Sequence, residues 1–146
     1  MIDLHLHLDG SLTAKDILEL ASKQKIPLPA DSEQALEKLL MAPQSGGSLN
    51  DYLKRFELPL LVLQTEAALR DGIYRLAGRL SGQGICYAEI RFAPQLHLRG
   101  GLTMGQVCEA ACEGLKHAFR DFPFIKVRLI PVSYTHLRAH ETSAHL

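Results

Sequence analysis

Two histidines near the N-terminus have the spacing of metal ligands. In residues 2–11, apolar and polar residues alternate, which predicts a β-strand with side chains on opposite faces. His5 and His7 are two positions apart, so their imidazoles leave the same face about 7 Å apart. Two neutral imidazoles at that spacing can bind one zinc ion. Asp9 and Gly10 are expected to end the strand, which places a carboxylate where parallel barrels carry their sites. An edge strand with two polar positions facing water would explain the spacing equally well.

The composition is that of an ordinary globular protein. The 146 residues are 47% hydrophobic and 22% charged, with 16 Lys and Arg against 16 Asp and Glu. Zero formal net charge argues against nucleic-acid binding, because phosphate contacts need a basic excess. No apolar run approaches membrane-spanning length, and the first residues do not resemble a signal peptide. Free thiols at Cys86, Cys108 and Cys112 favour the cytoplasm, and Cys108 and Cys112 are expected to be buried.

Helices and strands are expected to alternate along the chain. Helices are predicted after the caps Thr13, Thr65 and Thr103, over Ser32–Leu40, and over Leu49–Gln64 with a bend or restart at Pro59. Strands are predicted over Ile85–Phe92 and Ile125–Ile130. The order strand, helices, strand, helix, strand implies an α/β fold with parallel strands and helical crossovers.

Some side chains carry structural expectations of their own. On the second strand, Glu89 and Arg91 share a face and are expected to form an ion pair. Phe119 is assigned to the buried stripe of the last helix. His97 is expected in a loop, and His117 on a helix surface.

Residues 131–146 do not continue the pattern and are expected to be a non-native tail. From Val132 to Thr142 the sequence resembles a frame translation of a transposase sequencing-library adapter. His136 and His140 have the i, i+4 spacing of zinc ligands on a helix, but in this interpretation they are adapter codons. The fold prediction therefore rests on residues 1–130.

The first stretch, together with several later ones, resembles the adenosine deaminase family. The most specific match is His5-Leu6-His7-Leu8-Asp9-Gly10-Ser11-Leu12, and supporting matches cover residues 14–20, 26–29, 52–56 and 84–94. The resemblance implies a (β/α)8 TIM-like barrel with one Zn²⁺ ion at the carboxyl face of the strands. Residues 1–130 would form an incomplete N-terminal portion with about three parallel strands. The implied reaction is hydrolytic deamination of adenosine or deoxyadenosine to inosine or deoxyinosine and ammonia.

The resemblance also assigns roles to individual positions. His5 and His7 resemble the two zinc ligands of the first strand, and His7 also faces the substrate. Asp9 resembles the residue that hydrogen-bonds the ribose 5'-hydroxyl. Tyr52 and Phe56 resemble part of a helical wall over the substrate. From the residues alone, Asp9 can equally cap a turn, and Tyr52 and Phe56 can equally be core.

The family's remaining groups come from later strands, and their motifs are absent from this sequence. These are a His, a His-x-x-Glu pair that includes the proton donor, a further His and an Asp-Asp pair. We therefore expect the isolated chain neither to deaminate adenosine nor to bind zinc tightly. The expected partner is a small purine nucleoside, with no nucleic acid and no membrane, and the oligomeric state stays open.

Other functions compatible with the sequence are deamination of adenine or aminofutalosine within the same family. Those relatives tend to carry Glu where this chain has Asp9, so Asp9 favours a nucleoside. More distant H-x-H barrels that hydrolyse cyclic amides or phosphate esters are further alternatives, as is a non-catalytic binding module.

Overall fold

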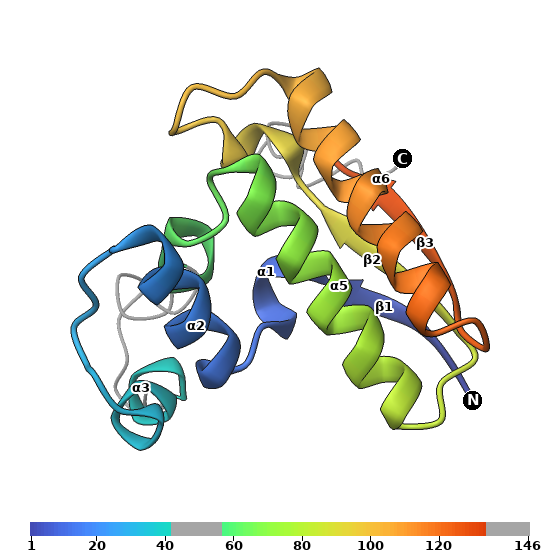
Figure 1. Ribbon diagram of the computed structural model, residues 1–146, viewed down its shortest axis with the longest axis horizontal. Coiled ribbons are helices and arrows are strands. Elements are labelled where there is room, and N and C mark those ends of the chain that lie inside the picture. The colour runs from blue at the N-terminus through green and yellow to red at the C-terminus, as the bar shows by residue number, and fades with distance from the viewer. Residues whose placement is uncertain (42–56, 134–146) are drawn as a thin grey trace, which may run out of the picture.

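Three parallel strands and their connecting helices make up the computed structural model, which describes residues 1–41 and 57–133 (Figure 1). The strands are β1 (Ile2–His7), β2 (Tyr87–Phe92) and β3 (Lys126–Pro131). The helices are α1 (Leu8–Ser11), α2 (Ala14–Gln24), α3 (Glu33–Leu40), α5 (Glu66–Gly82), the 3-10 turn η1 (Pro94–His97) and α6 (Met104–Asp121). Residues 57–61 are also helical. No helix within these ranges has the length and apolarity to cross a membrane.

The sheet confirms the predicted topology. Its strand order is β1-β2-β3, and both neighbouring pairs are parallel. Parallel neighbours need a crossover, which α5 supplies between β1 and β2 and α6 supplies between β2 and β3. The pairing of β1 with β2 shifts register between Asp3 and Leu6 and then brings His7 opposite Arg91.

The core lies between one face of the sheet and the helices α5 and α6, which run side by side across it (Figure 1). The alternation in β2 confirms the predicted faces, since Ala88, Ile90 and Phe92 are buried in this core. Apolar residues of the two helices complete it: Ala68, Leu69, Ile73, Leu76, Leu80, Val107, Ala110 and Ala111. On its other face, β2 carries Tyr87, Glu89 and Arg91.

Helix caps form where the sequence places them. Thr13 Oγ1 accepts a hydrogen bond from Asp16 N (3.1 Å), and the Asp16 carboxylate accepts one from Thr13 N (3.0 Å). Thr103 and Gln106 make the same reciprocal pair at the start of α6. Because both capping boxes are local, they fix helix starts independently of the rest of the fold.

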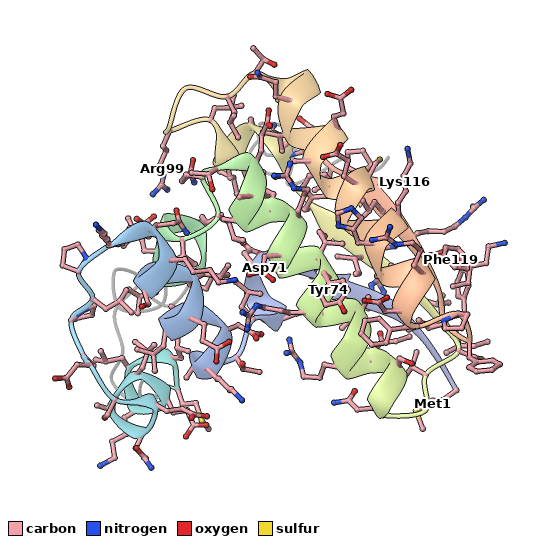
Figure 2. The ribbon with its side chains drawn as sticks, viewed as in Figure 1. Met1, Asp71, Tyr74, Arg99, Lys116 and Phe119 are labelled. Atoms are coloured by element: carbon pink, nitrogen blue, oxygen red, sulfur yellow. The ribbon has the colours of Figure 1, made fainter. Side chains whose placement is uncertain are left out.

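Two expectations about single side chains are wrong, whereas β1 does end before Asp9, at His7, and passes directly into α1. Cys112 is exposed, and Phe119 is 53% exposed on the side of α6 that faces away from α5 (Figure 2). Helical periodicity identifies the apolar face of a helix, but it does not show how much of that face other elements cover. On α6, the residue Phe119 lies outside the part that α5 and the sheet cover.

The end of β3 bears on the prediction that the native pattern stops at residue 130. Pro131 is the last residue of β3, and Val132 N donates to Phe92 O at 2.9 Å, so the ladder continues just past residue 130. These bonds use backbone atoms alone and do not depend on the side chains of the segment. Residues 134–146 lie outside the described residues.

Candidate metal site at the carboxyl end of the first strand

The two candidate metal ligands lie on the open face of the sheet. Leu6 packs against the hydrophobic core, whereas His5 and His7 on either side of it are exposed. The exposure of His5 and His7, on either side of the core-facing Leu6, places both residues away from the core. The His5 N–H donates to Asp3 Oδ1 at 3.1 Å, in the segment where the β1–β2 register shifts. The predicted alternation fails earlier in β1, where Ile2 and Leu4 are 62% and 49% exposed and Asp3 pairs with the buried Ala88.

The turn that follows β1 is held by its own residues and by the core. His7 is the N-cap of α1, and the Ser11 hydroxyl donates to His7 O at 2.6 Å, which ties the end of the turn to its beginning. Leu8 is fully buried, while Asp9 is half-buried. Asp9 therefore follows the two histidines in the chain and lies just past the carboxyl end of β1.

Polar side chains of β2 lie on the same open face. Glu89 accepts a hydrogen bond from Tyr87 Oη at 2.8 Å, and this bond raises the pKa of Tyr87. Arg91 donates to Leu4 O across the β1–β2 pair. The expected Glu89–Arg91 ion pair is therefore replaced by these two separate contacts. Glu89 bonds Tyr87, its neighbour on the other side along the same strand, and Arg91 reaches the backbone of β1.

A buried histidine that the sequence placed in a loop lies just past β2. His97, in η1, is 1% exposed, and its Nδ1 lies 2.8 Å from Leu63 O. A carbonyl can only accept, so Nδ1 carries the proton in this contact. Burial lowers the pKa of His97, against the opposing effects of the Leu63 bond and the Asp9 carboxylate. Its sequence neighbourhood shows no periodicity that would have signalled this burial.

The donors of this site suit zinc in type but are fewer than a complete site needs. Neutral imidazoles are preferred zinc ligands, and catalytic zinc sites use three protein ligands with one open position. Within residues 1–41 and 57–133, no group of three or more His, Cys, Asp or Glu side chains could hold a metal ion. His5 and His7 therefore fit as part of a coordination sphere. Tyr52 and Phe56, the candidate substrate wall, lie outside the described residues.

By its fold, the chain is similar to part of the TIM-barrel deaminases of known structure. The chain is similar to the crystal structure of an adenine deaminase from Arthrobacter aurescens, with a TM-score of 0.72 and 26% identity over 90% of this chain and 38% of that one. It shares the fold of a Burkholderia ambifaria amidohydrolase with bound Zn, with a TM-score of 0.69 and 21% identity over 89% of this chain and 34% of that one.

Sequence comparison identifies the family within this class. The family model for adenosine deaminase matches residues 1–146, and the chain belongs to the adenosine deaminase family, whose members are metal-dependent. It is 44% identical over 130 residues to an adenosine deaminase of Haemophilus ducreyi, covering 89% of this chain and 38% of that protein. It is 44% identical over 121 residues to one of Enterococcus faecalis, covering 83% of this chain and 36% of that protein. The chain thus spans little more than a third of these relatives' length.

Proposed function

We propose that this chain contributes the first-strand residues of a zinc-dependent site that hydrolyses adenosine or deoxyadenosine to inosine or deoxyinosine and ammonia. The observation that carries the proposal is the placement of His5 and His7 on the open face of β1, directly before the turn with Asp9. Relatives named adenosine deaminase, at 44% identity, support the choice of reaction.

The residues have separate tasks in this proposal. His5 and His7 bind the metal through neutral imidazole nitrogens, and Asp9 accepts a hydrogen bond from a ribose hydroxyl. Bound zinc supplies activation of water at neutral pH. Tyr52 and Phe56 exclude water from the base. The proton donor and further ligands belong to strands that this sequence lacks, so the 146-residue chain by itself does not turn over adenosine.

The proposal is tested by completing the barrel. Residues 1–130 are joined to the remainder of the Haemophilus ducreyi relative, the product is purified with zinc, and ammonia release from adenosine is measured. We expect turnover from the completed barrel and none from the 146-residue chain. H5A and H7A should each lower kcat/KM by more than about 100-fold, since even partners that only orient metal ligands are worth about 10–100-fold.

The matched control is H117A, because His117 is an exposed histidine on the surface of α6. We expect H117A to keep the activity and zinc content of the parent. Full activity in H5A or H7A, or turnover by the 146-residue chain alone, would refute the assignment of the site.

Adenine is the second candidate substrate. The similarity to the Arthrobacter aurescens adenine deaminase favours it, and a free base would leave Asp9 without a ribose partner. Comparing adenosine with adenine in the completed barrel separates the two. Faster turnover of adenine, unaffected by D9N, would replace the nucleoside assignment.

A further inference from the structure

One guanidinium group connects helix α5 to the turn that follows the metal strand. Arg79 Nη2 donates to Ser11 O at 2.6 Å, and Arg79 Nη1 donates to Asp16 Oδ2 at 2.8 Å. The two acceptors lie on either side of the link between α1 and α2. A single side chain near the end of α5 therefore fixes both ends of this link, at a sequence distance of more than sixty residues.

Asp16 in turn holds Arg79 in place. Asp16 is only 5% exposed, and its Oδ2 also accepts a hydrogen bond from the Thr13 N–H of the capping box. Arg75 Nη1 lies 3.7 Å from Asp16 Oδ1 and adds a second positive charge. A buried carboxylate with charged and backbone donors keeps a fixed position, since leaving any of its bonds unmade is costly.

Buried Leu8 and the Ser11 hydroxyl hold part of the turn, and Arg79 adds a contact at its end. α1 has four residues, far below the length at which a helix is stable in water. Ser11 O is one of its carbonyls without a partner inside the helix, and a cation there also favours the helix dipole. The Ser11 hydroxyl bonds back to His7 O, so the position of Ser11 is passed on to the last residue of β1.

From these contacts we propose that Arg79, held by Asp16, is a positioning residue that sets the placement of the turn bearing Asp9. It acts through Ser11 and touches neither metal nor substrate. The proposal rests on the proposed function in assigning Asp9 to substrate binding, but its structural part stands without that assignment.

Amide hydrogen exchange in the full 146-residue chain tests the structural part. In R79M, amides of residues 8–13 should exchange about tenfold faster than in the parent, because a charge-assisted hydrogen bond is lost. R79K should show a smaller increase, since its ammonium can reach only one of the two acceptors at a time.

R70M is the control, because Arg70 is an arginine of the same helix that pairs with Glu113 (3.0 Å) and does not contact the turn. It should leave residues 8–13 unchanged. Unchanged exchange at these residues in R79M would overturn the proposal, as would an increase of equal size throughout the chain.

Steady-state kinetics of the completed barrel tests the functional part. With Asp9 displaced, R79M should raise KM for adenosine about tenfold, while kcat stays within about threefold. A purely structural role would lower kcat through loss of folded enzyme and leave KM unchanged, which would refute the proposal. If the parent barrel is inactive, the proposed function fails, while the exchange experiment still decides the role of Arg79.

Discussion

Replacing Gly114 with alanine should destabilise the protein, although alanine is the better helix former. Gly114 lies on α6 where it packs against α5, and an added Cβ would lie 2.7 Å from Arg70 O and 3.0 Å from Ile73 Cβ. Ordinary contact begins at 3.4 Å, so the methyl group is roughly 0.7 Å too close to a backbone atom that cannot rotate away. The helices must therefore separate.

The expected loss follows from two opposing effects. Overpacking a well-packed interface costs about 1–3 kcal/mol, and Gly→Ala in a helix gains up to about 1 kcal/mol. G114A should thus lower the free energy of unfolding by up to about 2 kcal/mol, measured by urea denaturation followed by circular dichroism.

Gly105 offers a matched control on the same helix, because its added Cβ would meet only Thr103 Oγ1, at 3.9 Å. G105A should be neutral or stabilising by up to about 1 kcal/mol. If G114A proves as stable as G105A, the close approach of α5 and α6 at this point is not what limits the residue to glycine.

Three further predictions concern the segments around the site. Burial lowers the pKa of His97, so as the pH falls the unfolded chain binds a proton at this histidine before the folded chain does. The free energy of unfolding should therefore fall below about pH 6.5, by at most about 1.4 kcal/mol per pH unit. H97Q should flatten this pH dependence in urea titrations at about pH 5–8. Q64L should lower the free energy of unfolding by about 2 kcal/mol in thermal unfolding. The Gln64 side chain donates hydrogen bonds to Leu60 O (2.8 Å) and Leu96 O (2.9 Å) and accepts one from Arg99 N (2.8 Å). A loss below about 0.5 kcal/mol would show that water replaces these hydrogen bonds. T103A should lose about 1 kcal/mol in the same assay through its helix cap, and T103S should restore most of it.

The features that could be predicted from the sequence are those that depend on near neighbours. The capping boxes at Thr13 and Thr103, and the alternation of Ala88, Ile90 and Phe92, each involve residues within a few positions of one another. The parallel pairing was also predictable, because helices separate the strands along the chain.

The features that the sequence did not reveal depend on distant contacts. α1 is held by Arg79 and by the burial of Leu8, and neither leaves a periodic signal in residues 8–11. His97 is buried because its ring reaches Leu63 O, a partner 34 residues away. For the candidate site, the exposure of His5 and His7 agrees with their polar positions in the strand pattern, whereas the contacts of Arg79 with the turn that carries Asp9 were not predictable.

The two faces of the sheet carry different kinds of residues. Nearly all of the apolar core lies on the helix-covered side, while His5, His7 and the polar residues of β2 lie on the other. Substitutions on the open face therefore remove few of the contacts that keep the chain folded. A scaffold built in this way can acquire a new substrate preference by single steps, because each step leaves its folding almost untouched.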